Sequence, residues 1–547
     1  MWAANKNNYW LFAGLWGALL LLQAAVTPIH PDEAYYWMYA QQLDWGYFDH
    51  PPLVALFIWL GSHLFGGTFG VRLVTVLAHL GTLWLLYRLL PRRDDPRYLW
   101  TFWLLVSLLP LFHIYGFITT PDAPLLLTGS FFLYAYQRVL RDGRWADYLL
   151  LGLAAGLMAY AKYHGALLVL LAVAAHWRLL LQPRLYVAGL LAGALLLPHL
   201  YWQYAHDWPS FRYHLQERAG LGGEYLRYQS EYWLNVLVVL NPLLLVFFWR
   251  TLRRPLGELA QRMRFIWLGF LLFFFTQAFN QHVQPQWLVI TYLPLVLVVL
   301  DQWEAADFRH LRRLAWVGLP VLFAVRMCMA VDLLPFTDLD LHGWRAETEQ
   351  IHAAAQGRPV VVLNSYQMAG LYGFYQDAPR THSFNSATNR KNQFNLWLND
   401  TLLQDQEVLI VGDHHYKSFL KQDYGAFTGS VRRYRCFEHL VITPDAWEIE
   451  GDSVRLEATL YNPYPFPVDF ATDRIRVMAY YYRHGRKWWP EAFPATYLPL
   501  TTLAPGASVE RTFTFALISR PAEGFGLSLK RAGWPATTVM KRVPLEE

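Results

Sequence analysis

A short stretch near the N-terminus holds a high density of side chains that can move protons or bind cations. Residues 30–52 include four acidic residues and two histidines: Asp32, Glu33, Asp44, Asp49, His30 and His50. A carboxylate placed here can accept the proton of an attacking hydroxyl group. The alternative is structural, since Asp32 and Glu33 follow Pro31 directly, and acidic residues at a helix start offset the helix dipole. Asp44 is most simply a solvated turn residue.

Three further groups of polar residues stand in short links between apolar runs. They are Asp122 after Pro121, Lys162 with Tyr163, and Gln286 with Trp287 close to His282. A lysine or a carboxylate at the level of a membrane needs a partner of opposite charge. Each group also has an ordinary explanation, because Asp122 can cap a helix and Lys162 can extend its ammonium group to the membrane surface. The sequence alone leaves both interpretations open.

The elements that must position these residues are apolar runs long enough to cross a membrane. Hydrophobic residues make up 55% of the 547-residue chain and charged residues 16%, against about 25% charged residues in typical soluble domains. We predict about eleven spans, at 9–26, 70–90, 98–116, 122–140, 146–161, 163–181, 184–201, 231–249, 265–280, 287–300 and 314–331. The first span is predicted to be retained, because no cleavage signal follows it.

Arginines indicate which side of the membrane each loop faces. They gather in every second loop between the predicted spans, for example at 88–97 and 250–264. Because arginine-rich loops are cytoplasmic, the N-terminus is predicted to be cytoplasmic, and the four polar groups and everything after residue 332 to face outward. The short apolar run Leu53–Phe65 would reverse this parity if it crossed the membrane. It is therefore predicted to be an interfacial or re-entrant helix.

The chain after residue 332 loses the membrane pattern. Gly343–Gln356 predicts an amphipathic helix, and Val360–Leu363 and Val408–Val411 predict short buried strands. From about residue 437 apolar and polar residues alternate, as in a β-sandwich, in the runs Ser453–Leu460, Arg474–Tyr482 and Ser508–Leu517. We predict three domains: a transmembrane catalytic domain at 1–332, a small α/β domain at 333–435, and a β-sandwich-like domain at 436–547. The last two are expected to lie outside the cytoplasm as accessory domains. The fold class is mainly α, a polytopic membrane helical bundle with these two additions.

Composition excludes some functions and favours one. A net charge of +5 is too weak to indicate nucleic acid, and the two cysteines, Cys328 and Cys436, have neither a disulfide pattern nor a metal-binding spacing. A polar site at the outer membrane interface, with carboxylates and cationic groups together, suits a substrate whose lipid tail lies in the bilayer. Cations would bind its phosphate leaving group, and a carboxylate would take the proton of the acceptor hydroxyl.

At these residues the sequence resembles the GT-C superfamily, specifically bacterial members related to protein O-mannosyltransferases and to the lipid A aminoarabinose transferase. The resemblance rests on Asp32-Glu33, Asp49-His50-Pro51-Pro52 and Pro121-Asp122, and Lys162-Tyr163 and Gln286-Trp287 resemble further family positions. It covers about residues 8–330 and is strongest in the first 60. Residues 333–435 resemble the soluble tail of bacterial members, whereas the last hundred residues match no family pattern.

The resemblance implies an inverting glycosyltransferase of the bacterial inner membrane that builds the cell envelope. Its donor would be a polyprenyl-phosphate-linked sugar and its acceptor an extracytoplasmic lipid, glycan or protein. Asp32 is then the candidate base and Glu33 its neighbour, Asp122 positions the acceptor or the base, and Lys162 pairs with the donor phosphate. The remaining candidates for substrate binding are Asp49, His50, Tyr163, Gln286 and Trp287.

One departure from the family pattern concerns the residues before Pro51-Pro52. The aminoarabinose transferase has Glu-Lys there, whereas this chain has Asp49-His50, and histidine is mostly neutral at pH 7. Asp49 and His50 either contact the phosphate or bind a divalent metal ion with an outer-loop partner such as His282. The sequence leaves the use of a metal, the sugar and the acceptor open.

Two alternatives come from other functional classes. A transporter or flippase for a lipid-linked glycan predicts internal repeats, discontinuous helices and charges in the middle of several spans. The sequence shows no such repeat, and its charges cluster at one interface. A non-catalytic membrane scaffold predicts that the C-terminal domains carry the function.

Overall fold

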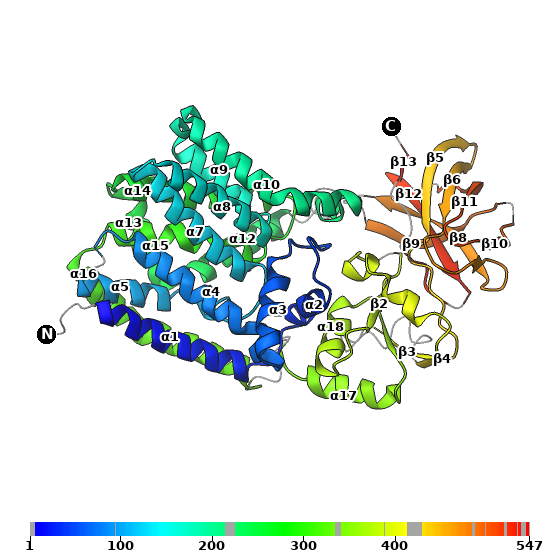
Figure 1. Ribbon diagram of the computed structural model, residues 1–547, viewed down its shortest axis with the longest axis horizontal. Helices are drawn as coiled ribbons and strands as arrows, with labels where there is room; N and C mark the ends of the chain where they lie inside the picture. Colours follow the sequence, from blue (N-terminus) through cyan, green and yellow to red (C-terminus); the bar gives the residue numbers. More distant parts are fainter. Residues whose placement is uncertain are drawn as a thin grey trace. The chain divides into compact units, whose positions relative to one another are not determined.

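The chain divides into two compact units in the computed structural model (Figure 1). The first unit is Met1–Ser210 with Glu224–His342, and the second is Phe211–Gly223 with Gly343–Glu547. The structure describes residues 6–92, 95–213, 225–333, 341–387, 389–412, 429–483, 487–497, 499–518, 522–532, 534–537 and 543–545.

The first unit is a bundle of helices around one apolar core. Its longer helices are α1 (Lys6–Val26), α4 (Gly67–Leu89), α5 (Pro96–Ser107), α7 (Asp122–Arg141), α8 (Trp145–Ala161), α9 (Gly165–Ala175), α10 (Pro183–Ala205), α12 (Tyr225–Leu240), α13 (Leu245–Arg253), α14 (Glu258–Gln277), α15 (Tyr292–Asp301) and α16 (Ala305–Ala330). Shorter pieces link them: α2 (Pro31–Gln41), α3 (Leu53–Leu64), α6 (Pro110–Ile114), α11 (Pro209–Arg212) and the 3₁₀ turns η1 (Trp177–Leu181), η3 (Pro242–Leu244) and η4 (Pro285–Thr291). Helices α1 and α16 lie side by side (Figure 1).

Five described helices are long and apolar enough to cross a membrane, and a sixth crossing is formed if α12 and α13 count as one bent span. Many of their apolar side chains point away from the core; on α10, for example, Leu190 and Tyr201 are more than 70% exposed. Exposed apolar faces of this length fit a lipid environment. The other expected spans fall on shorter or less apolar helices, so the total of eleven stays a prediction.

Two of the expected spans are interrupted where proline breaks the helix. The run 231–249 bends by 72° between α12 and α13, because Asn241 adopts a positive φ of 62° and Pro242 cannot donate a backbone hydrogen bond. The Asn241 side chain donates to the Leu108 carbonyl oxygen at 2.7 Å and accepts from the Leu243 backbone at 3.1 Å. Likewise, the run 98–116 is divided into α5 and α6 just before Pro110.

The second unit begins with a small α/β arrangement that matches the predicted elements. Strand β1 (Val360–Leu363) pairs in parallel with β2 (His382–Phe384) and with β3 (Val408–Val411), and β4 (Gly429–Val431) pairs antiparallel to β3. Two helices accompany the sheet, α17 (Trp344–Ala355) and α18 (Tyr366–Tyr375), with 3₁₀ turns η5 (Gln393–Asn395) and η6 (Leu398–Leu403). The predicted helix at 343–356 and both predicted strands are confirmed within one or two residues.

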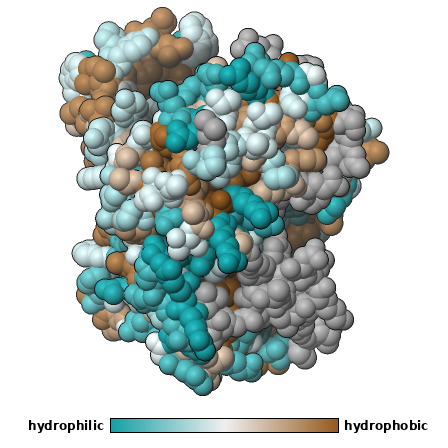
Figure 2. All heavy atoms as spheres, turned by 90° about the vertical axis from the view of Figure 1, so that its right-hand side faces the viewer, coloured by the Kyte–Doolittle hydropathy of each residue, from teal (hydrophilic) through white to brown (hydrophobic). Residues whose placement is uncertain are grey.

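The rest of the second unit is a β-sandwich. One sheet has the order β11-β6-β5, and the other has the order β13-β12-β8-β9; their inward residues share a single apolar core. The strands are β5 (Val441–Glu450), β6 (Ser453–Tyr461), β8 (Ile475–Arg483), β9 (Lys487–Pro494), β11 (Ser508–Ala516), β12 (Gly524–Arg531) and β13 (Val543–Pro544), with a small extra pair of β7 (Val468–Asp469) and β10 (Thr502–Leu503). Figure 2 shows one face of the molecule, with hydrophilic residues over much of the coloured surface. The three predicted alternating runs are confirmed as β6, β8 and β11.

Candidate functional site

The acidic stretch after α1 forms the N-terminus of helix α2. His30 is the N-cap residue, and its Nδ1 accepts a hydrogen bond from the Asp32 backbone at 3.1 Å. In return the His30 backbone donates to Glu33 Oε2 at 3.0 Å. This reciprocal arrangement is a capping box, and Pro31 occupies the first helical position, where its missing N–H group is harmless. The cap therefore uses Glu33 and leaves the half-buried Asp32 carboxylate outside it.

Glu33 is also the anionic half of a fully buried ion pair. The Arg72 guanidinium, on α4, donates to Glu33 Oε1 at 2.9 Å and to Oε2 at 2.5 Å, and both side chains are 0% exposed. Arg72 additionally donates to the carbonyl oxygens of Thr27 and Pro28. The Thr119 backbone donates to Glu33 Oε1 at 2.8 Å. A buried pair is tolerated only when further hydrogen bonds satisfy both groups, and here they tie α2, α4 and the link before α7 together.

Asp122 and Lys162 form the second buried ion pair. Lys162 Nζ donates to both Asp122 carboxylate oxygens, at 2.8 and 2.9 Å, and the two residues are 6% and 3% exposed. Asp122 stands at the N-terminus of α7, and Lys162 directly follows the C-terminus of α8. The sequence identified both residues without indicating that they are each other's partner.

The start of α2 and the link before α7 are in direct contact. The Thr119 backbone, three residues before Asp122, donates a hydrogen bond to Glu33, the neighbour of Asp32. Tyr115 lies just after α6, in the same link. The two predicted catalytic carboxylates, 90 residues apart in the sequence, thus stand on segments that touch each other.

Asp49 is held by the aromatic side chains of α2. Its Oδ2 accepts hydrogen bonds from the hydroxyl groups of Tyr35 at 2.9 Å and Tyr39 at 3.2 Å, and Asp49 is 5% exposed. The Tyr39 ring stacks on Tyr47 at a centroid distance of 4.1 Å. Burial raises the pKa of the Tyr47 hydroxyl well above its usual range. Tyr47 therefore stays protonated and donates to the backbone at the end of α2. His50 packs edge-on against Tyr36.

Helix α10 links this stretch to the segment that carries Lys162. Tyr163 and His199 are joined through the Tyr163 hydroxyl and His199 Nε2 at 3.2 Å, and Gln203 donates to the same hydroxyl at 3.1 Å. Gln203 also donates to Ser210, whose hydroxyl donates to the Tyr47 carbonyl oxygen at 3.0 Å. Asp44 is exposed, as predicted, and it accepts a hydrogen bond from the Trp202 ring at 2.7 Å.

The last predicted group is divided between two places. Trp287 is buried, and its ring lies 5.3 Å from the ring of His164, two residues after Lys162. Gln286 instead donates to the neighbouring Gln284 side chain. His282 pairs with Glu231 of α12 at 2.7 Å. Within the described residues, Asp49, His50 and His282 do not form a group with donor atoms within 4.8 Å of one another, so the metal alternative for these three gains no support.

Sequence reasoning missed Arg72, Tyr115, His199 and Gln203. Arg72 left a readable signal, because an arginine inside a predicted span needs a buried anionic partner, and Glu33 was available. Tyr115, His199 and Gln203 have no such signal in the sequence. Only their positions in the structure show that they belong to the site.

Comparison with known proteins gives one family match. Residues 49–202 match the family model described as dolichyl-phosphate-mannose-protein mannosyltransferase. The matched segment contains Asp49, His50, Asp122, Lys162 and Tyr163, and it begins after Asp32 and Glu33.

A curated relative and two solved structures extend this match. The chain is 28% identical over 296 residues to the lipid A galacturonosyltransferase RgtD of Rhizobium johnstonii, covering 51% of this chain and 61% of that protein. The chain thus spans about three fifths of that relative. The crystal structure of ArnT from Cupriavidus metallidurans in the apo state has a TM-score of 0.56 at 14% identity, over 76% of this chain and 95% of that one. ArnT bound to undecaprenyl phosphate gives 0.55 at 16% identity, over 77% and 95%.

Proposed function

We propose that this chain, a multi-pass membrane protein with the fold of the GT-C membrane glycosyltransferases, transfers a sugar from a polyprenyl-phosphate donor to an acceptor on the outer side of the inner membrane. The observation that carries the proposal is the hydrogen bond from the Thr119 backbone to Glu33, which holds the half-buried Asp32 and the Asp122–Lys162 pair on segments that touch each other. Asp32 acts as the base. The reaction is a single displacement that inverts the configuration at the anomeric carbon of the sugar. The acceptor oxygen forms the new bond to that carbon while the bond to the phosphate oxygen breaks, and Asp32 takes the acceptor proton.

Lys162 supplies the positive charge for the departing lipid phosphate. An ammonium group has three N–H donors, and two are directed at the Asp122 carboxylate oxygens. The third N–H group of Lys162 can then donate to an oxygen of the donor phosphate. Negative charge develops on that oxygen as the sugar leaves, so this contact is stronger in the transition state. Asp122 then acts as a positioning residue, because it aims the ammonium group.

Glu33 is assigned a positioning role in this scheme. Its two oxygens are committed to Arg72, the Thr119 backbone and the helix cap. These bonds fix the carboxylate to α4, to the link before α7 and to the start of its own helix. Its contribution is to hold the N-terminus of α2, and so Asp32, against the link that carries Asp122.

The acceptor is proposed to be a saccharide-bearing lipid of the lipid A type. The name of the relative RgtD gives lipid A as what that protein modifies. A lipid acceptor would reach a site at the membrane interface by lateral diffusion, since Asp32 and Asp122 both follow or open membrane helices. If lipid A accepts no sugar from any donor in the assay below, the lipid acceptor is wrong.

The test is a transfer assay with purified protein, lipid A and a panel of undecaprenyl-phosphate sugars. Asp32→Asn should lower the transfer rate by roughly 100-fold or more, as expected for loss of a general base, while donor binding is retained. The matched control is Asp95→Asn. Asp95 caps α5 through its side chain, asparagine caps equally well, and the arginine pattern places it on the opposite side of the membrane.

If Asp32→Asn transferred sugar at the wild-type rate, Asp32 would not be the base. Movement of the lipid-linked sugar across vesicles without cleavage of the phosphate–sugar bond would instead favour a flippase.

A further inference from the structure

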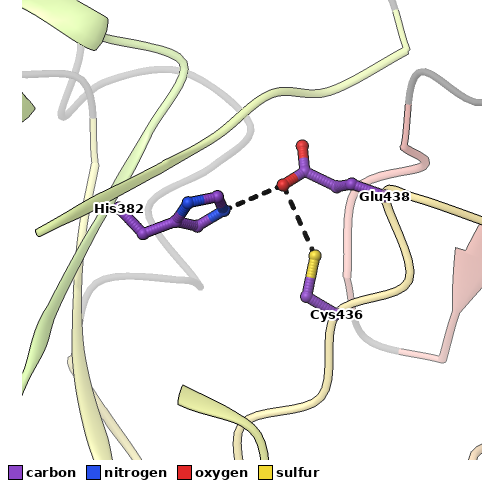
Figure 3. A group of neighbouring side chains, drawn as sticks. All are labelled: His382, Cys436 and Glu438. Carbon is purple, nitrogen blue, oxygen red and sulfur yellow. Dashed lines mark hydrogen bonds and ion pairs between the residues drawn. The ribbon is translucent and has the colours of Figure 1, made fainter. Parts of the chain in front are cut away.

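Three metal-binding side chains meet in the interior of the second unit, far from the predicted catalytic residues in the sequence. They are His382 of β2 and, from the segment after β4, Cys436 and Glu438 (Figure 3). One potential ligand atom from each lies within 4.8 Å of the other two. His382 is 0% exposed, Cys436 1% and Glu438 6%. The imidazole, thiol and carboxylate point toward one another (Figure 3).

The separations within the group suit a small cation. His382 Nε2 lies 2.9 Å from Glu438 Oε2, and Cys436 Sγ lies 3.5 Å from the same oxygen. Ligands of a tetrahedral Zn²⁺ ion, with bonds of about 2.0–2.3 Å, lie about 3.3–3.8 Å apart. Shifts of a few tenths of an ångström at the histidine would therefore admit the ion.

The Glu438 carboxylate is oriented by its surroundings. Oε1 accepts a hydrogen bond from the Asn385 backbone at 2.9 Å and one from the Asn395 side chain at 3.4 Å. This leaves Oε2 directed at His382 and Cys436. Hydrogen bonds to the far side of a ligand are the means by which proteins aim metal-binding groups.

Charge balance favours a divalent ion in this interior. A buried carboxylate is costly away from water unless a positive charge lies beside it. A divalent cation bound by carboxylate and thiolate, with neutral imidazole, makes a site of zero net charge. Binding releases the thiol proton, and the imidazole proton resides on Nδ1. The mixed nitrogen, sulfur and oxygen donors suit Zn²⁺ rather than Mg²⁺ or Ca²⁺.

We propose that His382, Cys436 and Glu438 form a structural Zn²⁺ site that joins β2 of the α/β sheet to the segment leading into the β-sandwich. A water molecule would complete the tetrahedron. Cys436 packs in the core of the α/β part together with Trp534, from the sandwich part of the chain. The ion would thus hold together two parts of the second unit that are distant in sequence.

The experiment uses the full chain purified in detergent without histidine tag, stripped of metal with a chelator and then titrated with Co²⁺ or Zn²⁺. Co²⁺ should bind with a stoichiometry of one and produce a thiolate-to-cobalt charge-transfer band, which Zn²⁺ then abolishes. Zn²⁺ should also raise the Tm of the stripped protein. Cys436→Ser should lose the charge-transfer band, and Glu438→Gln should weaken Co²⁺ binding at least 10-fold. The readouts do not involve sugar transfer.

Cys328→Ser is the matched control, because Cys328 is the other cysteine and lies in α16 of the first unit. It should bind Co²⁺ like the wild type. Glu438→Gln keeps the size of the side chain, so it stays informative if Cys436→Ser fails to fold. The proposal is overturned if folded wild-type protein shows no charge-transfer band and no Zn²⁺-dependent change in Tm, which would leave the group as a hydrogen-bonded cluster only. An equal signal in wild type and Cys436→Ser would also overturn it.

Discussion

At the scale of single residues, neighbouring carboxylates have different environments although their sequence contexts look alike. Asp32 and Glu33 are adjacent, but Glu33 is completely buried with Arg72, whereas Asp32 is half-buried. Helix geometry is the reason, because successive residues on a helix point about 100° apart. The sequence could identify the pair as acidic and well placed, but it could not divide their roles.

A substitution at Glu33 should act mainly on stability. Glu33→Gln removes the charge that neutralises Arg72, and breaking one half of a buried ion pair costs about 3–5 kcal/mol. We expect a clearly lower Tm in detergent and a lower folded yield. The control is Asp142→Asn, which breaks the exposed pair with Arg141 and should leave Tm unchanged. Equal Tm values for Glu33→Gln and wild type would show that the buried pair does not stabilise the fold.

At the scale of helices and strands, hydrophobic periodicity predicted well which segments form helices or strands. It predicted poorly where those elements are interrupted. The strands β6, β8 and β11 and the helix α17 lie within a residue or two of their predicted bounds, because their side-chain alternation is local information. The bend at Asn241 was not predicted. Its positive φ is stabilised by a hydrogen bond to Leu108, 133 residues away, and no local pattern reports such a contact.

Close packing of α8 against α10 gives a prediction at this scale. A Cβ atom on Gly152 would lie 2.4 Å from the Ala188 carbonyl oxygen, whereas one on Gly189 would meet nothing within 4 Å. Gly152→Ala must therefore push the two backbones apart, at a cost of about 1–3 kcal/mol. Gly189→Ala should be neutral or slightly stabilising, since alanine favours helix. The Tm of Gly152→Ala should therefore be lower than that of Gly189→Ala. Equal Tm values would mean that α8 and α10 are not packed this closely.

At the scale of the whole molecule, the sequence predicted the class of protein and the residues to test, but not which of these residues contact one another. The apolar runs and the pairs at Asp32 and Asp122 led to the membrane glycosyltransferase hypothesis, and the similarity of the fold to ArnT agrees with it. The partners Glu33–Arg72 and Asp122–Lys162 link positions 39 and 40 residues apart. Such pairings depend on how the helices pack, which hydropathy does not encode.

The arginine distribution predicts the orientation of the whole chain. Alkaline phosphatase fused after Glu547 should be active, because the C-terminal part is expected outside the cytoplasm. Green fluorescent protein fused at the same position would be exported with it and should not fluoresce. Fusions of both reporters after Arg93, in a predicted cytoplasmic loop, are the control and should give the opposite result. A fluorescent C-terminal fusion would contradict the predicted orientation of the C-terminal part.

The Glu33–Arg72 pair also bears on how the chain enters the membrane during synthesis. An arginine at the centre of an apolar helix costs about 2.5–3.5 kcal/mol on insertion scales, and Arg72, in the N-terminal part of α4, carries a share of that cost. Glu33 precedes Arg72 by 39 residues and is therefore synthesised first. The segment that carries Glu33 can then supply the negative charge that pairs with Arg72 as α4 partitions into lipid. Glu33 would act in this way as an intramolecular insertion aid for α4, and the order of the two residues along the chain matters as much as their contact in the finished fold.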